Sequence, residues 1–431
     1  MGAACSVDSW RLVAERGMSP ALVAVRLAPS IVAAVLIVAC STPAPPVPTI
    51  APVASLPTAA ATTPSLRGPA LVHISTVTAV DSGNAWVVAD ELTPAVVAGL
   101  LRTQDGGASW RVVATTLPTL RDLQFVTRER GFASVAEAGC TQTVDCNTVI
   151  RSDDGGATWR RVYAAAGPIA WLQFVDATHG WIIVSGGSLV RTTDGGDTWQ
   201  PLAGDGPTSG RFVSPTRGWM VFRTSTEPTT AAVLGGPWSI RATDDGGTSW
   251  VEQLALPRSA WPPLIASSGD KTLWILSSEP DTCSNSGCEG WLLWRTTDAG
   301  RTWSLIQRPT HKAGDPLWWA TPLPPGARAL GFLGTPSFAD ERFGVIPVGT
   351  SGGEGVGGVL VTTDGGTTWL RRSDGQLGSG SACGKLATGH CSVAVPDRSA
   401  WVVIGIGDFN TLQRTSDAGT VWQQQLPEGL R

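Results

Sequence analysis

The sequence predicts an all-β fold, a single seven-bladed β-propeller of four-stranded antiparallel blades. Three observations predict it: an eight-residue motif that occurs seven times, a strand pair before each copy, and spacings of 40 to 66 residues between copies. Repeats at such periods are typical of solenoids, propellers or arrays. The motif, called the box below, occurs as TQDGGASW (103–110), SDDGGATW (152–159), TTDGGDTW (192–199), TDDGGTSW (243–250), TTDAGRTW (296–303), TTDGGTTW (362–369) and TSDAGTVW (415–422).

Each box is predicted to form the tight turn of a β-hairpin. An apolar residue precedes each copy, and six copies also follow an arginine, a pattern typical of a strand entering a turn. Asp, Ser and Thr side chains hydrogen-bond nearby backbone N–H groups, and Gly adopts the positive φ of such a turn. The closing Trp is expected to begin the next strand and to bury its ring. We therefore expect a structural role for the box aspartates, which are Asp105, Asp154, Asp194, Asp245, Asp298, Asp364 and Asp417.

A second repeat lies upstream of the boxes. It is clearest in FVTRERGFASV (125–135), FVDATHGWIIV (174–184) and FVSPTRGWMVF (212–222), and weaker relatives occur in the other units. Each copy predicts a strand, a polar turn and a second strand that opens on a small residue and an aromatic one. One such pair before each box gives four strands per unit.

The boxes resemble the Asp-box, or bacterial neuraminidase repeat, of sialidases, xyloglucanases, sortilin-type receptors and the photosystem II stability and assembly factor family. The layout is most similar to the last family, which has a single seven-bladed propeller with a Gly-Trp strand before each box. The resemblance covers roughly residues 71–431. The resemblance is highly specific for the fold. It is only weakly specific for the activity, because the repeat occurs in proteins of unrelated function.

Residues 1–39 are predicted to be a lipoprotein signal peptide. Leu27–Ala39 is a thirteen-residue apolar stretch after several arginines, too short to span a bilayer but suited to a signal-peptide core. It leads into Ile37-Val38-Ala39-Cys40, which resembles the bacterial lipobox, in which the cysteine is acylated. A plain secretory signal with a chance cysteine is the alternative. Met18 would be a more typical start than Met1.

The remaining chain has two parts. Residues 40–70 are the lipidated Cys40 and a Pro/Ala/Thr-rich linker, and residues 71–431 are the propeller. We expect an exported protein, anchored to a membrane on its extracytoplasmic side. The net charge of −4 and the lack of a basic run give no support for nucleic-acid binding. A monomer is expected.

Six cysteines remain beyond the signal peptide and Cys40. Close pairs in an exported chain predict disulfides. The alternative, a metal site, needs converging ligands, and only Cys383 with His390 and Cys391 comes near that pattern. We expect no metal and no cofactor, since the GxGxxG match at 353–358 lies in a loop and not between a strand and a helix. The predicted disulfides are Cys140–Cys146, Cys283–Cys288 and Cys383–Cys391.

Catalysis is the less favoured interpretation. The resemblance implies that a sialidase would carry an Arg-Ile-Pro-type motif, an arginine triad and a Tyr nucleophile paired with Glu. This chain lacks the motif, and its only tyrosine, Tyr163, follows a box in a predicted outermost strand. Other glycosidases use paired carboxylates. The candidate pairs are Asp90/Glu91, Glu279/Asp281 and Asp340/Glu341.

One segment and one set of arginines are candidates for partner contact. The longest interval between boxes contains the segment 308–336 with the adjacent Trp318 and Trp319, which either bind a partner or cap the propeller's own apolar face. Arginines also recur in the polar turns, where they either form a positive ring or only keep the turns solvated. They are Arg128, Arg130, Arg217, Arg342 and Arg398.

The favoured function is a non-catalytic lipoprotein propeller that binds or helps to assemble a membrane or surface protein partner. The alternative is a secreted glycan-binding protein or a sialidase-like glycoside hydrolase.

Overall fold

The computed structural model describes residues 73–425 except 94–95, 116, 118, 137–146, 166, 185–186, 205, 225–235, 260, 280–282, 285–286, 289–290, 308–330, 351–357, 373–391 and 407–408. The chain divides into residues 1–51 and residues 52–431, and only the second unit contains described residues. The predicted signal peptide, Cys40 and linker therefore lie outside the described residues.

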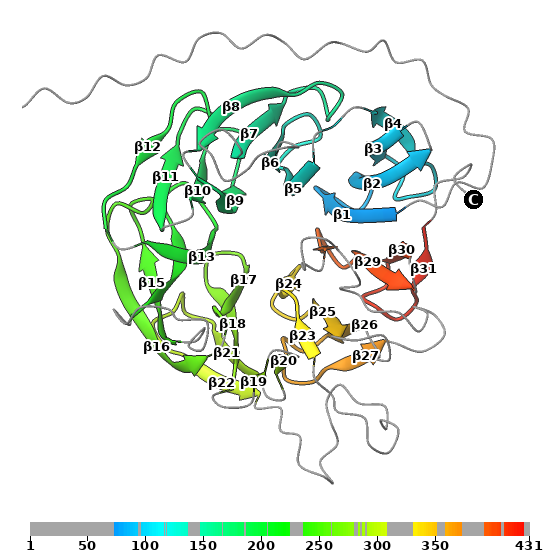
Figure 1. Cartoon of the computed structure of the whole chain (residues 1–431). Helices are drawn as coiled ribbons and strands as arrows, with labels where there is room; N and C mark the ends of the chain where they lie inside the picture. The colour runs from blue at the N-terminus through cyan, green and yellow to red at the C-terminus, as the bar shows by residue number, and fades with distance from the viewer. Residues whose placement is uncertain are drawn as a thin grey trace, which may run out of the picture. The chain divides into compact units, whose positions relative to one another are not determined.

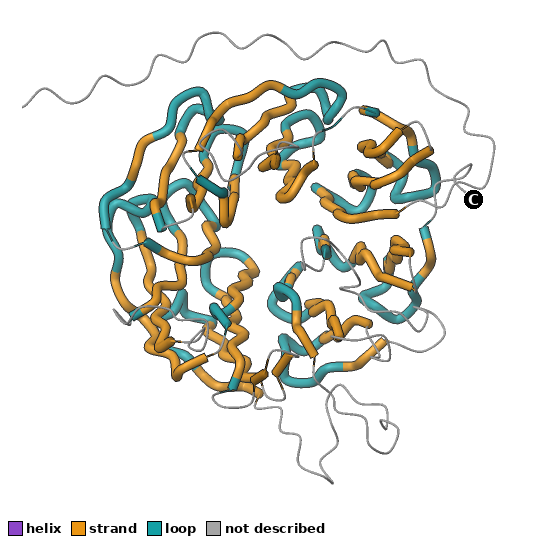
Figure 2. Tube along the Cα trace, in the orientation of Figure 1, coloured by secondary structure: helices purple, strands orange, loops and turns teal. Residues whose placement is uncertain are grey.

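The second unit consists of seven antiparallel sheets arranged in a ring (Figure 1). The described residues form strands, turns and loops and no helix (Figure 2). In each blade the chain runs from the innermost strand outward, and neighbouring strands are antiparallel. These observations confirm the predicted seven-bladed propeller of four-stranded blades.

The two inner strands of each blade surround the centre of the ring. The innermost strands are β1 (His73–Ala79), β5 (Thr119–Phe125), β9 (Ile169–Phe174), β13 (Pro207–Phe212), β17 (Leu264–Ser268), β23 (Gly331–Leu333) with β24 (Ser337–Phe338), and β28 (Val393–Ala394). The second strands are β2 (Ala85–Thr93), β6 (Gly131–Ala136), β10 (Gly180–Val184), β14 (Gly218–Arg223), β18 (Thr272–Ser278), β25 (Gly344–Thr350) and β29 (Ala400–Ile406).

The two outer strands of each blade flank the box. The third strands are β3 (Val96–Thr103), β7 (Asn147–Ser152), β11 (Ser188–Thr192), β15 (Gly236–Thr243), β21 (Trp291–Thr296), β26 (Gly358–Thr362) and β30 (Phe409–Thr415). The fourth strands are β4 (Arg111–Ala114), β8 (Arg160–Ala165), β12 (Gln200–Pro201), β16 (Val251–Ser259), β22 (Ser304–Gln307), β27 (Leu370–Arg372) and β31 (Gln423–Gln424).

Blade 5 carries an additional hairpin, β19 (Cys283–Ser284) and β20 (Gly287–Cys288), between its second and third strands. This hairpin does not join its own blade. Instead, β20 pairs with β23 of blade 6 through Cys288 and Gly331. Blades 5 and 6 are therefore connected by backbone pairing as well as by side chains.

The core is divided among the interfaces between blades. Seven clusters of buried apolar residues each combine side chains from two neighbouring blades. Trp86 and Val88 of blade 1, for example, pack with Leu123 and Phe125 of blade 2. Because each sheet is buried on both faces, its second strand is largely apolar, as in β10, where all five residues are buried.

An aromatic stack between blades explains the second sequence repeat. The aromatic residue near the start of one second strand stacks on the Phe that ends the first strand of the next blade. Centroids are 3.8 Å apart for Trp86–Phe125, 3.4 Å for Phe132–Phe174, 3.6 Å for Trp181–Phe212 and 3.6 Å for Trp274–Phe338, and the planes lie within 5° of parallel.

The glycine of the repeat makes room for this stack. A Cβ atom on Gly180 would lie 2.5 Å from the ring of Phe174, its cross-strand partner, and one on Gly218 would lie 2.4 Å from Phe212. Real Cβ atoms do not approach other carbons so closely. The Phe-Val and Gly-Trp pairs of the repeat therefore depend on each other. The glycine leaves room for the Phe ring of its own blade, and the Trp stacks on the Phe ring of the next blade.

Among the described residues, the ring closes between blades 1 and 7 without a shared strand, because the four strands of each of these blades come from one stretch of chain. The Ser392 hydroxyl accepts a hydrogen bond from Val77 N (2.7 Å) and donates one to Val77 O (3.2 Å). Arg414 donates to Ser82 O at 3.2 Å, and Trp401 is buried among apolar residues of blade 1. Closure thus depends on side chains.

Candidate functional site

We call one end of the ring the box face. There, the boxes join third to fourth strands and the polar turns join first to second strands. The longest undescribed segments (137–146, 225–235, 308–330 and 373–391) follow strands that end at the opposite face. The arginine-bearing turns therefore lie at the end of the propeller opposite to the ends of these strands.

Each box aspartate is hydrogen-bonded within its own hairpin. In blade 3, Asp194 Oδ1 accepts from Thr192 Oγ1 and Thr198 N, both at 2.8 Å, and Oδ2 accepts from Thr198 Oγ1 at 2.6 Å. Thr192 Oγ1 in turn accepts from Gly196 N at 2.8 Å. The other boxes repeat this pattern, except that Val421 in the last copy supplies only its backbone N–H.

These hydrogen bonds hold the box carboxylates in the ionised form. Bonds from Ser109, together with one from Thr103, lower the pKa of Asp105 from 3.8 to about 2. Bonds from Ser249 and Thr302 bring the pKa values of Asp245 and Asp298 to about 2 as well. Hydrogen bonds that favour the charged form have this effect.

The box Trp belongs to the turn and does not begin the next strand, so that expectation was wrong. Every fourth strand begins one residue after it, for example at Arg160 after Trp159. In three boxes the indole N–H donates back to the carbonyl of the second box glycine, as from Trp159 to Gly156 at 2.9 Å. This bond keeps the ring over the turn.

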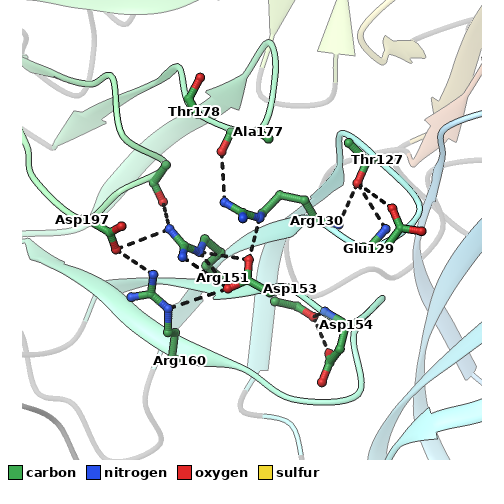
Figure 3. A network of polar contacts seen from close by, with 12 residues as sticks. Thr127, Glu129, Arg130, Arg151, Asp153, Asp154, Arg160, Ala177, Thr178 and Asp197 are labelled. Carbon is green, nitrogen blue, oxygen red and sulfur yellow. Dashed lines mark hydrogen bonds and ion pairs between the residues drawn. The ribbon is translucent and has the colours of Figure 1, made fainter.

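An alternating network of charges joins blades 2 and 3 on the box face (Figure 3). Arg151 donates to Gly195 O (2.8 Å) and contacts Asp153 and Asp197 (3.2 and 3.3 Å). Arg130 binds Asp153 and donates to Ala177 O at 3.1 Å, while Arg160 contacts Asp197 at 2.6 Å.

The network favours the charged form of Asp197. Partial burial acts to raise the pKa of Asp197, but the hydrogen bond from Arg160 and the charges of Arg151 and Arg160 outweigh it and lower the pKa. Only 9% of the Arg151 side chain is exposed, and its planar guanidinium contacts several acceptors at once. Arg151 therefore acts as a link between blades.

The five arginines singled out in the sequence all lie in turns of the box face, and each has a partner there. The contacts are Arg128–Asp81 (3.0 Å), Arg130–Asp153, Arg217–Asp244 (2.6 Å), Arg342 with Thr363 O (3.2 Å) and Arg398–Asp340 (3.3 Å). Four of these five contacts are to carboxylates. Arg128 and Arg398 are exposed, with 60% and 66% of their side chains accessible.

A cavity of about 400 Å³ lies at the centre of the box face. All seven blades contribute to it, chiefly through the last residues of their first strands and the residues that follow. A collar of small apolar residues surrounds it, consisting of Val80, Val126, Val175, Val213, Ala339 and Val395. The polar lining side chains are those of Gln124, Gln173, Arg211, Ser267 and Ser268.

Two glutamines in the cavity wall connect neighbouring first strands. Gln124 donates to Phe174 O (2.7 Å) and accepts from Phe174 N (2.9 Å). Gln173 makes the same pair of bonds to Phe212, at 2.9 and 2.8 Å. We did not identify these residues from the sequence, although a Gln-Phe pair at the same place in two repeats is a visible signal.

Other predicted residues are placed only in part. Trp318, Trp319, Cys140, Cys146, Cys383 and Cys391 lie outside the described residues. Cys283 and Cys288 are directly opposite in the β19–β20 pair. Tyr163 lies in β8, an outermost strand, 5.1 Å from the ring of Trp199, and burial raises its pKa.

Within the described ranges, no group of three or more His, Cys, Asp or Glu side chains is arranged to hold a metal ion. Likewise, no helix in those ranges has the length and apolar character to cross a membrane.

The sequence matches no protein-family model and no curated protein. Among solved structures, the chain is similar to the β-propeller domain of the Trilobed protease from Pyrococcus furiosus (9% identity, covering 83% of this chain and 98% of that chain, TM-score 0.52). It is also similar to YCF48 bound to a D1 peptide (18%, 72% and 81%, TM-score 0.43) and to a GH74 xyloglucanase from Xanthomonas campestris (16%, 83% and 68%, TM-score 0.42). At these identities the similarity shows the propeller fold alone.

Proposed function

We propose that this protein is a non-catalytic binding propeller, exported and lipid-anchored at Cys40, that binds or helps to assemble a partner protein at its box face. The observation that supports this most is the composition of that face. An apolar collar at its centre is surrounded by rigid turns with exposed arginines such as Arg128 and Arg398. Apolar centres with polar rims and arginine anchors are typical of protein interfaces.

The carboxylates of the described residues support binding over glycoside hydrolysis. Glycosidases need one carboxyl group that stays protonated at working pH. Asp340 instead accepts from the backbone N–H groups of Arg342 (2.7 Å) and Phe343 (2.6 Å) and contacts Arg398. Burial acts to raise its pKa, but these hydrogen bonds outweigh that effect and lower it. Its neighbour Glu341 accepts from Thr272 Oγ1 at 3.1 Å.

The position of Tyr163 supports the same conclusion. A tyrosine nucleophile must lose its proton and reach the substrate. Tyr163 lies in the outermost strand of blade 2, and burial raises its pKa, so that its hydroxyl stays protonated.

The test is a pull-down from native membranes with the full lipidated protein. We expect Arg128→Glu/Arg398→Glu to reduce partner recovery at least tenfold, because both arginines are exposed on the box face, and their loss costs little stability in surface pairs. Arg258→Glu, in β16 on the rim of blade 4, is the matched control and should retain the partner.

A second double variant tests the other candidate contact. Trp318→Ala/Trp319→Ala changes the segment that follows β22 in the chain. If this variant loses the partner and the arginine variant does not, the contact lies in segment 308–336 and the proposal for the box face is wrong. Turnover of a sialoside or β-glycoside that one carboxylate substitution abolishes would overturn the non-catalytic proposal.

A further inference from the structure

The cavity of the box face contains one arginine where the repeat places glutamine. Gln124, Gln173 and Arg211 each precede the phenylalanine that ends a first strand. Each glutamine uses its amide to donate to and accept from the next strand. A guanidinium has no acceptor atom. Arg211 therefore cannot make the connection that the two glutamines make.

Among the described residues, the Arg211 side chain forms a single hydrogen bond, from Nε to Ser267 Oγ at 3.2 Å. Its remaining N–H groups face a cavity whose described lining residues include no aspartate or glutamate. The five arginines of the polar turns have carboxylate or carbonyl partners. Arg211 is thus different from them in both position and pairing.

The surroundings of Arg211 favour an anionic partner. The Arg211 side chain is exposed to solvent inside the cavity, although the surrounding protein lowers its pKa. Arginine nevertheless keeps its charge, because its ordinary pKa lies far above neutral pH. Because Arg211 has no carboxylate partner among the described lining residues, an anion can bind its exposed N–H groups without first breaking an ion pair. A ligand that brings a negative group into the cavity therefore gains charge-assisted hydrogen bonds.

We propose that this cavity binds the carboxylate of a ligand, held by the free N–H groups of Arg211 while the attached apolar part lies against the valine collar. The planar guanidinium matches a carboxylate through two parallel hydrogen bonds. A volume of about 400 Å³ is in the range of small-ligand pockets and admits a short chain end. The inference deepens the proposed function, since a partner's chain terminus is one source of such a group.

The first test uses hexanoate, which combines a carboxylate with an apolar tail, and hexanol, which lacks the charge. Binding to the purified full-length protein is followed by NMR titration at constant ionic strength. We expect saturable binding of hexanoate, at least tenfold weaker binding of hexanol, and at least tenfold weaker hexanoate binding by Arg211→Gln. Equal binding of the two probes, or unchanged binding by Arg211→Gln, would overturn the proposal.

Thermal stability distinguishes a ligand-binding arginine from a structural one. In Arg211→Gln the amide can bond the backbone of blade 5 as Gln124 bonds Phe174, so Tm should stay the same or rise. A variant that loses both stability and hexanoate binding would assign Arg211 a structural role and contradict the proposal. Arg342→Gln removes an arginine from the box face outside the cavity lining, and it should bind hexanoate as the wild type does.

The source of the carboxylate is resolved with the tripeptide acetyl-Ala-Ala-Val as free acid and as amide. Tighter binding of the acid, lost in Arg211→Gln, supports recognition of a chain terminus. Hexanoate binding without peptide binding supports a small acid as the ligand. Neither result depends on the pull-down, so the proposed partner and the carboxylate site can fail separately.

Discussion

Trp181 of blade 3 lies face to face with Phe212 of blade 4, with ring centroids 3.6 Å apart and planes 4° from parallel. The Trp181 indole N–H also donates to Gly246 O in the box of blade 4, at 3.0 Å. One side chain therefore contacts both the first strand and the box of the next blade. Trp86 makes the equivalent stack and bond, to Phe125 and Gly155.

Gly180→Ala should destabilise the propeller by about 2 kcal/mol, the usual cost of overpacking a core. The new methyl group would meet the ring of Phe174, which is itself stacked on Phe132. Urea unfolding followed by Trp fluorescence measures the loss. Gly83→Ala is the control, because its Cβ would meet nothing closer than 3.4 Å, and it should change stability by less than about 0.5 kcal/mol. Equal losses in the two variants would refute the role of the stack.

Stability should fall as pH decreases from about 4 to 2. The pKa of Asp105, Asp245 and Asp298 is lowered from 3.8 to about 2 in the folded chain. The unfolded chain therefore binds more protons in this range, so the stabilisation is complete above pH 4 and is lost as pH falls through the folded pKa. Thermal melts between pH 6 and 2 measure it. Asp105→Asn does not titrate, so its Tm should depend less on pH, and an unchanged pH dependence would contradict this account.

Asp194→Ala should cost about 1–2 kcal/mol, because Thr198 N and the hydroxyls of Thr192 and Thr198 lose their acceptor. The measurement is chemical denaturation, and partner recovery should be unchanged below the melting transition. Loss of partner binding in a folded Asp194→Ala protein would make the box a functional site.

Arg151→Lys should destabilise the junction of blades 2 and 3 by about 1–2 kcal/mol, because an ammonium cannot contact Gly195 O, Asp153 and Asp197 together. Arg128→Lys changes an exposed pair with Asp81 and should cost less than about 0.5 kcal/mol. Denaturation midpoints measure the loss of stability in the two variants. A larger loss in Arg128→Lys than in Arg151→Lys would contradict the role of Arg151 as a link between blades.

Cys40 should carry a lipid. Mass spectrometry of the mature N-terminus is expected to show a diacylglyceryl group on Cys40. Cys40→Ala should move the protein from membranes into the soluble fraction, and unchanged membrane retention would contradict the prediction.

The repeats predicted the fold because they are local. The boxes predicted the hairpins between third and fourth strands. The Phe-Val and Gly-Trp pairs predicted the hairpins between first and second strands. The pairing of β20 with β23 was not predictable in the same way, because it joins segments from two blades with a long insertion between them. The start of the fourth strands also differed by one residue, since the Trp159 indole bonds back into its turn.

The candidate site was predicted less completely. Sequence reasoning identified the arginines of the turns, but their partners could not be inferred, because Arg128 and Arg398 contact carboxylates of the preceding blade. The cavity depends on seven strand ends that meet only in the closed ring. Arg211 occupies the position that Gln124 and Gln173 occupy in their repeats. That this position lines a central cavity becomes visible only when the ring is closed.

The closure of blades 1 and 7 by Ser392, Trp401 and Arg414, rather than by a shared strand, affects how the protein folds. Blade 1 can form completely while later residues are still being synthesised, because none of its strands comes from the C-terminal part. Growth then proceeds one blade at a time, each new sheet covering the apolar face of the last. Only the exposed face of blade 1 must wait for the final residues, so that face is where an incomplete chain is most prone to aggregate.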